Sequence, residues 1–465
     1  MSQSVLAGNK NISVIEDIRT LIGDRISTSQ SVLEQHGRGE SWHPVQAPDA
    51  VCFVRSNEEV AGIVKLCAAS KTPVIAYGTG TSLEGQVQAV KGGICIDLSE
   101  MNEVIDVNQE DLDCRVQAGV TRRQLNEMLR DTGLFFPIDP GANTSIGGMA
   151  ATRASGTNAV KYGTMRENVM GLTVVTASGE IMKIGTRAKK SAAGYDLTRL
   201  FVGSEGTLGV ITEISLRLYG VTESISAAIV NFPDVQSAAQ ATMETIQLGI
   251  PIARIEILDS HYIKAINQYS KTEYPERDTL FLEFHGSQKS VADQIEQFSE
   301  IAEFNGGGDF EWAENEADRA RLWRARHDAY YAGLAVKPGS RGYVTDVCVP
   351  ISRLAECITE TQMDIAESGL FAPIIGHVGD GNFHSTVFFD ADDEEVFQKV
   401  LQYDKRLVGR ALAMGGTCTG EHGIGMGKLK HMRHEHGDAA VDMMRAIKQA
   451  LDPDNIMNPG KVIDC

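Results

Sequence analysis

Two histidines stand on either side of a glycine-rich turn in the stretch GHVGDGNFH at residues 376–384. If Asp380-Gly381 forms a two-residue hairpin turn, His377 lies directly opposite His384 on one face of the paired strands. Side chains opposed in this way have Cβ atoms about 5 Å apart, so both imidazoles can bind one metal ion. The alternative is a structural histidine pair satisfied by hydrogen bonds.

A third ligand is expected from the stretch GGTCTGEHGIGMGK at residues 415–428, where glycines enclose Glu421 and His422. Glycines let a backbone and a ligand approach closely, and a carboxylate completes a metal site that two histidines begin. Neighbours in an extended segment point to opposite sides, so His422 is expected to face a substrate while Glu421 faces the metal. The alternative is that Glu421 is an exposed loop acid.

The composition favours two mixed α and β domains. The 465 residues exceed what one core usually serves, and 42% of them are hydrophobic. A net charge of −19 without any basic cluster argues against a nucleic-acid partner. The eight cysteines contain no C-x-x-C pair, which indicates a reducing compartment. Since no transmembrane segment or leader is apparent, we expect a cytoplasmic protein, with peripheral membrane contact left open.

Hydrophobic periodicity divides the chain into three parts. Residues 1–45 read as an N-terminal helical lead, with helical spacing of apolar positions over 13–35. Residues 46–221 predict an α+β domain, in which 58–70 is a helix. In residues 222–465, long helices alternate with strands, which predicts an antiparallel sheet covered by helices; the last ~50 residues are expected to pack back on the first domain. The expected strands include 73–77, 93–98, 172–177, 180–184, 225–232, 280–286 and 383–389.

Three runs of small residues in the 46–221 domain predict a large, phosphate-bearing ligand, because the backbone amides of such loops cradle phosphates. The first run is neither G-x-G-x-x-G nor followed by a P-loop lysine, which disfavours a classical NAD fold or a nucleotide hydrolase. The alternative is a set of tight turns between short strands. The runs are PVIAYGTGTSLEG (73–85), PIDPGANTSIGGMAATRASGTNAVKYG (137–163) and LFVGSEGTLGVITE (200–213).

In their order along the chain, these motifs and NPGK at 458–461 resemble the FAD-linked oxidases of the vanillyl-alcohol-oxidase superfamily. The closest resemblance is to the D-lactate and D-2-hydroxyacid dehydrogenases that do not use NAD, and it covers residues 46–463. It implies a PCMH-type FAD-binding domain of two subdomains, followed by a substrate domain built on an antiparallel sheet. It also implies non-covalent FAD, since Thr81 stands where covalently flavinylated relatives often have histidine.

The resemblance also implies roles for individual residues. His377, His384 and Glu421 correspond to the ligands of a divalent metal, zinc or manganese, and His422 corresponds to the catalytic base. In LWRARHDAYYAG (322–333), the Trp-x-x-Arg spacing selects Arg326 over Arg324 as the arginine that binds the substrate carboxylate; the alternative is that both lie on a solvated helix face. The residues expected to bind FAD are Gly78, Thr79, Gly80, Thr81, Ser82, Pro140, Thr144, Gly147, Gly148, Ser155, Gly156, Asn158, Gly206, Ile211 and, near the isoalloxazine, Asn458.

The implied activity is oxidation of a D-2-hydroxy acid to the 2-keto acid, with hydride passing to FAD N5 and His422 as base. D-lactate or a similar monocarboxylate is favoured, because Val344 stands where relatives acting on D-2-hydroxyglutarate look to carry lysine. A D-2-hydroxyglutarate or glycolate dehydrogenase, or a subunit of one, is the alternative.

Other classes of protein are weighed against this activity. They are a non-haem iron oxygenase, which needs no FAD domain, a non-redox transferase on the same scaffold, and a non-catalytic flavin-binding subunit. The electron acceptor is left open between a quinone, a cytochrome and an electron-transfer protein, and a homodimer is left open as well.

Overall fold

The computed structural model describes residues 3–308, 310–313 and 315–465, so the first two residues of the expected helical lead lie outside the described residues. Contacts between residues divide the chain into two compact units. Unit 1 comprises Met1–Ser155, Gly163–Val221 and Glu421–Cys465, and unit 2 comprises Gly156–Tyr162 and Thr222–Gly420. The chain therefore passes from unit 2 to unit 1 between Gly420 and Glu421, inside the segment expected to supply a metal ligand.

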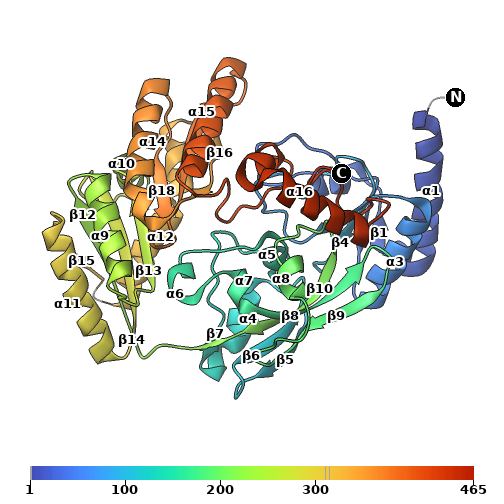
Figure 1. Cartoon of the computed structure of the whole chain (residues 1–465), viewed down its shortest axis with the longest axis horizontal. Helices are drawn as coiled ribbons and strands as arrows, with labels where there is room; N and C mark the ends of the chain where they lie inside the picture. Colours follow the sequence, from blue (N-terminus) through green and yellow to red (C-terminus); the bar gives the residue numbers. More distant parts are fainter. Residues whose placement is uncertain (1–2, 309, 314) are drawn as a thin grey trace. The chain divides into compact units, whose positions relative to one another are not determined.

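Unit 1 contains a four-stranded sheet in the order β1-β2-β4-β3 and a five-stranded sheet in the order β5-β6-β10-β8-β9. All strands of the five-stranded sheet are labelled in Figure 1. In the first sheet β2 and β3 both run parallel to β4, and the second sheet is antiparallel throughout. A short antiparallel pair joins β7 to β11. The strands are β1 (Ile26–Ser27), β2 (Ala50–Phe53), β3 (Val74–Tyr77), β4 (Ile94–Asp97), β5 (Val104–Asn108), β6 (Asp113–Gln117), β7 (Leu134–Phe135), β8 (Val169–Thr176), β9 (Ile181–Gly185), β10 (Gly209–Arg217) and β11 (Tyr219–Gly220).

Helix α3 (Asn57–Ser70) shows how the sequence determines a helix of unit 1. The Ser56 side chain accepts the backbone N–H of Glu59 and so caps its start, and Lys71 ends it in the left-handed conformation with φ 57°. Val60, Ile63, Val64 and Cys67 recur at helical spacing and are buried in the core of unit 1. The helix predicted over 58–70 is confirmed.

The helical lead differs in part from the prediction. Helix α1 (Gln3–Ile22) covers the first apolar positions, and Ile18 and Ile22 are buried. The helical spacing was expected to continue to residue 35, but Ile26 starts strand β1, which pairs with β2, and a second helix follows over Gln30–His36. Gly23, with φ 65°, precedes the strand and breaks the helical pattern there. The other helices of unit 1 are α2 (Gln30–His36), α4 (Arg122–Leu129), α5 (Ile146–Thr152), α7 (Met165–Asn168), α8 (Leu197–Phe201) and α16 (Met432–Leu451), with 3-10 turns at Gly23–Arg25, Arg130–Thr132 and Leu429–His431.

Unit 2 is built on an antiparallel sheet in the order β15-β12-β14-β13-β18-β19-β16, with β17 also paired to β19. Neighbours in this sheet come from distant parts of the chain, since β13 pairs with β18. The predicted antiparallel sheet covered by helices is confirmed, and its strands lie between Ser224 and Asp390. The strands are β12 (Ser224–Phe232), β13 (Arg254–Leu258), β14 (Asp278–Gly286), β15 (Glu311–Trp312), β16 (Ser340–Val344), β17 (Val347–Cys348), β18 (Ile374–His377) and β19 (Asn382–Asp390).

Helices lie along both faces of this sheet. Helices α9 and α11 pack on β12 and β14 and can be seen beside them in Figure 1. On the other face, Phe281 of β14 and Leu258 of β13 share a buried cluster with Tyr262 of α10 and Trp323 of α12. The side chains of β13 and β14 that lie on the same face as Phe281 and Leu258 therefore face α12. The helices of unit 2 are α6 (Ala159–Tyr162), α9 (Val235–Gln247), α10 (Ser260–Ser270), α11 (Gln288–Phe304), α12 (Glu316–His327), α13 (Ala329–Val336), α14 (Leu354–Ser368) and α15 (Glu394–Ala413), with 3-10 turns at Ile351–Arg353 and Val378–Asp380.

Candidate active site

His377 and His384 lie on the same face of the sheet in unit 2, with ring centroids 5.6 Å apart. Their register differs from the prediction. His377 pairs with Asn382, and His384 pairs with Ile375, so the two histidines are diagonal rather than directly opposed neighbours. The predicted two-residue turn was wrong, because the chain makes a 3-10 turn over Val378–Asp380 and closes it at Gly381 with φ 78°. Diagonal neighbours on one face are still within reach of long or aromatic side chains.

Each of the two imidazoles is oriented by a hydrogen bond at Nδ1. His377 Nδ1 is 2.6 Å from Glu256 Oε1, and His384 Nδ1 is 3.0 Å from the backbone carbonyl oxygen of Thr345. A carbonyl oxygen and an ionised carboxylate only accept, so both Nδ1 atoms carry a proton, and in the neutral form of each ring the lone pair lies on Nε2. Two buried imidazoles oriented in this way could serve as two ligands of a metal ion.

Glu256 on β13 is fully buried and joins His377 to the arginine that the sequence singles out. Its Oε2 accepts from Arg326 on α12, at 2.6 Å from Nη2 and 3.1 Å from Nε. Burial alone would raise the pKa of Glu256, but the neighbouring His377 and Arg326 outweigh burial and lower that pKa below its ordinary value. Arg324, two positions earlier, is exposed, so α12 directs only Arg326 toward this group.

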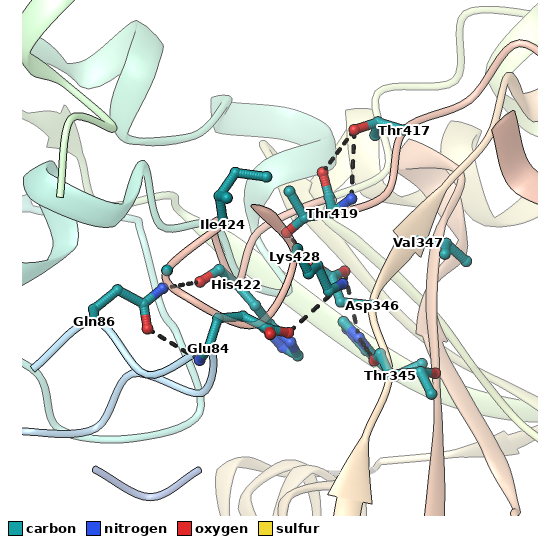
Figure 2. Close-up of polar contacts among 12 residues, drawn as sticks. Glu84, Gln86, Thr345, Asp346, Val347, Thr417, Thr419, His422, Ile424 and Lys428 are labelled. Carbon is teal, nitrogen blue, oxygen red and sulfur yellow. Dashed lines mark hydrogen bonds and ion pairs between the residues drawn. The ribbon is translucent and has the colours of Figure 1, made fainter. Parts of the chain in front are cut away.

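The segment that precedes Glu421 is anchored in unit 2 by Asp346, which is buried completely. Thr419 Oγ1 donates to Asp346 Oδ2 at 2.6 Å, and Asn382 Nδ2 donates to Asp346 Oδ1 at 2.7 Å. Figure 2 shows Thr419 and Asp346 side by side. A Cβ atom at Gly420 would lie 2.1 Å from Asn382 Nδ2, so only glycine fits at this position.

The segment that follows Gly420 is anchored in unit 1. Gln86 Nε2 donates to the carbonyl oxygen of His422 at 2.8 Å, and this contact appears as a dashed line in Figure 2. Glu205 accepts the backbone N–H groups of Ile424 and Gly425 at 2.7 and 2.8 Å. Burial raises the pKa of Glu205 to about 7, although these two N–H donors act to lower it.

Two further side chains support this part of unit 1. Lys428 Nζ lies 3.7 Å from Glu84 Oε1, and both residues are buried. Figure 2 shows this ion pair beside Gln86. Gln86, directly after the first glycine-rich run, therefore holds the backbone of His422, and Glu84, within that run, holds the Lys428 side chain.

The residues expected to bind FAD lie mainly in loops of unit 1. The first group, Gly78 to Ser82, follows β3; Pro140 and Thr144 precede α5, which contains Gly147 and Gly148; and Gly206 precedes β10, which contains Ile211. Ser155 is the last residue of its stretch of unit 1, and Gly156 and Asn158 belong to unit 2. In unit 2, Asn158 Oδ1 accepts from Arg254 Nε at 2.9 Å.

Three of these loops converge within unit 1. Asn458 donates its backbone N–H to Val74 O at 2.8 Å and its side-chain amide to Glu205 O at 2.7 Å. A Cβ atom at Gly78 would lie 2.3 Å from Ser145 Oγ, so the first loop lies against the second. Three buried hydroxyl oxygens, those of Ser82, Thr144 and Ser204, have no hydrogen-bond partner among the described residues. Buried, unsatisfied hydroxyl groups in these loops fit a polar ligand such as FAD.

Comparisons with known proteins identify the family of this chain. Residues 221–462 match the family described as "FAD linked oxidases, C-terminal domain", and residues 48–185 match "FAD binding domain". The chain belongs to the FAD-linked oxidases. A "Probable D-lactate dehydrogenase, mitochondrial" of Danio rerio is 54% identical over 455 residues, which cover 97% of this chain and 92% of the relative. A "D-lactate dehydrogenase [cytochrome], mitochondrial" of Arabidopsis thaliana is 45% identical, with 97% and 80% covered.

The fold of this oxidase is also found in a solved structure of p-cresol methylhydroxylase with substrate bound. The two superpose with a TM-score of 0.78 at 17% identity, covering 98% of this chain and 97% of the other. The expected PCMH-type fold of α+β class, with an FAD-binding domain and a C-terminal oxidase domain, is thereby confirmed. Within the part of the chain that the structure describes, no helix combines the length and the apolar character needed to cross a bilayer.

The prediction from sequence missed the acidic residues that hold the site. Glu256 interrupts the apolar strand RIEIL, and a charged residue at the centre of a buried strand is the signal that could have identified it. Glu283 on β14 gives the same signal without contacting a proposed site residue, since its Oε1 is 2.6 Å from His285 Nε2 and its Oε2 is 2.6 Å from Trp323 Nε1. Glu205 gives no comparable signal, because it lies in a loop of small residues.

Proposed function

We propose that this oxidase is an FAD-dependent D-2-hydroxyacid dehydrogenase that converts D-lactate or a similar monocarboxylate to the 2-keto acid. The observation that carries the proposal is the buried pair His377 and His384, each hydrogen-bonded at Nδ1, in a chain of the FAD-linked oxidase family. The names of the relatives from Danio rerio and Arabidopsis thaliana support D-lactate as the substrate.

The donor set favours a divalent metal, zinc or manganese, held by His377, His384 and Glu421. Glu421 is supported as the third ligand by the chain itself. Thr419 is bound to Asp346, and Asp346 is bound to Asn382, which faces His377 in the strand ladder. A chain advances at most about 3.6 Å per residue, so the Cα atom of Glu421 lies within about 7 Å of that of Thr419.

The proposed reaction removes one proton from the 2-hydroxyl group and one hydride from the same carbon. His422 takes the hydroxyl proton as general base. Bound FAD supplies the acceptor for the hydride, and a bound dication would lower the pKa of the hydroxyl as a Lewis acid. Because His422 follows Glu421 directly, the segment that supplies the third ligand also supplies the base.

Arg326 is proposed to bind the substrate carboxylate. Its Nε and Nη2 atoms face Glu256, so the opposite end of the guanidinium, which carries Nη1, is the end that remains for a ligand. A carboxylate held there is fixed in orientation, so the hydrogen on C2 can be presented in one direction only.

The test is anaerobic mixing of the FAD-loaded protein with D- and L-lactate, glycolate, D-2-hydroxybutyrate and D-2-hydroxyglutarate, followed by flavin absorbance. D-lactate is expected to bleach the flavin, and L-lactate is not. Treatment with a chelator should abolish the bleaching, and Mn²⁺ or Zn²⁺ should restore it. Bleaching by none of the acids would contradict the proposed function, and undiminished bleaching after verified metal removal would contradict metal assistance.

D-2-hydroxyglutarate and glycolate are the alternative substrates. Val344 on β16 offers no cation to a second carboxylate, which speaks against D-2-hydroxyglutarate. Glycolate lacks the methyl group of lactate and loses only a small amount of apolar contact, about 1–3 kcal/mol per methylene. The same panel therefore ranks the three acids.

For the electron acceptor we propose a cytochrome, because the Arabidopsis relative carries that word in its name. Reduction of cytochrome c by the enzyme with D-lactate tests this, with a soluble quinone as the comparison. Both relatives are named as mitochondrial proteins, so the cytoplasmic location expected from sequence is an open prediction that imaging of a tagged protein would check.

A further inference from the structure

Glu256 holds two groups of the proposed site with one carboxylate. Its Oε1 lies 2.6 Å from His377 Nδ1, and its Oε2 lies 2.6 Å from Arg326 Nη2. We propose that Glu256 is a positioning residue that orients the metal-binding imidazole of His377 and the substrate-binding guanidinium of Arg326 together. This inference rests on the proposed function.

The strand ladder explains why Glu256 reaches His377. Ile257 pairs with Gly376 in the antiparallel pair β13 and β18, so Glu256 and His377 are the next residues along the two strands. Arg326 reaches the other oxygen from α12, whose Trp323 packs on the same face of the sheet as Leu258 and Phe281. The carboxylate is thus fixed by a strand and its two partners come from two other elements.

The choice of a charged acceptor for His377 has a chemical consequence. His384 donates its Nδ1–H to a neutral carbonyl oxygen, whereas His377 donates to a carboxylate, which raises the basicity of the opposite ring nitrogen more strongly. The negative charge is offset by Arg326, whose side chain is 12% exposed, so a buried, unpaired ion is avoided. Orienting His377 and Arg326 together therefore requires that both carboxylate oxygens of Glu256 accept hydrogen bonds.

The substitution Glu256→Gln tests this directly. Glutamine keeps the size of the side chain but has one acceptor oxygen and an amide that only donates, so it cannot satisfy His377 and Arg326 together. We expect the dissociation constant for Mn²⁺, measured by calorimetry on the FAD-loaded, metal-depleted protein, to rise about 10- to 100-fold. The KM for D-lactate should rise as well.

Glu283→Gln is the matched control. Glu283 is a buried carboxylate on the neighbouring strand β14, and its partners are His285, Trp323 and Arg254 rather than His377 or Arg326. Loss of this carboxylate should disturb the same face of the sheet while leaving the Mn²⁺ dissociation constant within about twofold of the wild type. The melting temperature of both variants reports general damage.

The outcomes separate this inference from the proposed function. If the wild-type protein binds no Mn²⁺, the metal part of the proposed function fails. If the wild type binds Mn²⁺ and Glu256→Gln changes neither the Mn²⁺ affinity nor the KM, or changes only one of them, the shared role of Glu256 is overturned while the proposed function stands.

A measurement on the wild type covers the case in which Glu256→Gln does not fold. In the FAD-loaded, metal-free protein labelled with ¹⁵N-histidine, His377 should carry its proton on Nδ1, with that proton strongly deshielded by the carboxylate. Assignment uses the His377→Gln variant, in which this signal is absent. A proton on Nε2 of His377 would overturn the proposal.

Discussion

Gln86 and His422 are 336 positions apart in the sequence, yet Gln86 Nε2 donates to the carbonyl oxygen of His422 at 2.8 Å. Gln86 follows directly after the first glycine-rich run, which is expected to bind FAD. The backbone of the proposed base is therefore fixed by a residue next to the loop that is expected to bind FAD, as Figure 2 shows for the dashed contact between Gln86 and His422.

Substitution Gln86→Ala should lower turnover by releasing this contact. Loss of one buried hydrogen bond costs about 1–3 kcal/mol, so we expect kcat for D-lactate to fall roughly tenfold while the flavin spectrum is retained. The matched control is Gln88→Ala, because the Gln88 side chain is also buried but donates to Ser41 Oγ. Equal loss of kcat in the two variants would show that general packing, and not the contact to His422, is responsible.

A second prediction concerns Glu205, which binds the segment that follows His422. Its two oxygens accept the N–H groups of Ile424 and Gly425, and in Glu205→Gln only one acceptor oxygen remains. At pH 8, above the Glu205 pKa of about 7, the carboxylate is ionised. A hydrogen bond to a charged group is worth about 1.5–3 kcal/mol, so amide exchange in a peptide covering residues 423–427 should become roughly 10- to 100-fold faster by mass spectrometry at that pH. Glu213→Gln, which removes a carboxylate bonded to Asn57 and Thr173, should leave this peptide unchanged.

Local elements could be predicted from the sequence because neighbouring residues determine them. The strands expected at 172–177 and 180–184 form the antiparallel pair β8 and β9, and the helix expected at 58–70 is α3. The common face of His377 and His384 was also predicted, although through the wrong register. The predicted and observed registers differ by two residues, and a shift of two leaves every side chain on the same face of the sheet. The prediction of a common face was therefore correct.

The rest of the site depends on pairings between distant segments. Glu256 meets His377 because β13 pairs with β18, and strand order in a sheet is decided by packing that a single sequence does not reveal. The contact of Glu205 with Ile424 and Gly425 likewise joins a loop after α8 to the segment after Gly420. Periodicity and turn signals carry no information about such contacts.

His43 predicts a pH dependence of stability in unit 1. Burial, helped by the charges of Lys461 and Lys430, lowers the pKa of His43 from 6.5 to about 4. In the unfolded chain His43 therefore binds a proton near pH 6.5, and in the folded chain it does so only near pH 4. The free energy of unfolding falls as pH decreases through this window, by about 2 kcal/mol at pH 5. The Tm of the His43→Asn variant should fall less than that of the wild type between pH 8 and pH 5.

A control for this experiment is His434→Asn, because His434 is exposed on α16. Its Tm difference between pH 8 and pH 5 should match that of the wild type. If the Tm difference of His43→Asn also matches that of the wild type, folding does not lower the pKa of His43.

Thr419 predicts a link between Asp346 and metal binding. The substitution Thr419→Val removes the hydroxyl that donates to Asp346 at 2.6 Å and leaves a buried carboxylate with one donor fewer. Since this contact precedes Glu421 by two residues, we expect a weaker Mn²⁺ affinity, by roughly tenfold. Thr419→Ser keeps the hydroxyl and should behave as the wild type; an unchanged affinity in Thr419→Val would show that Glu421 does not depend on this anchor.

Arg326 allows the sharpest test of substrate binding, because α12 carries a matched arginine two positions away. Lysine in place of Arg326 keeps the charge that Glu256 requires but loses the planar fork that could hold a carboxylate and Glu256 at once. The KM for D-lactate in Arg326→Lys is expected to rise roughly 10- to 100-fold, since a hydrogen bond between charged groups is worth about 1.5–3 kcal/mol. Arg324→Lys, on the exposed side of the helix, should leave the KM unchanged. An increase in KM for Arg324→Lys, with a normal KM for Arg326→Lys, would assign Arg326 to the structural pairing with Glu256 alone.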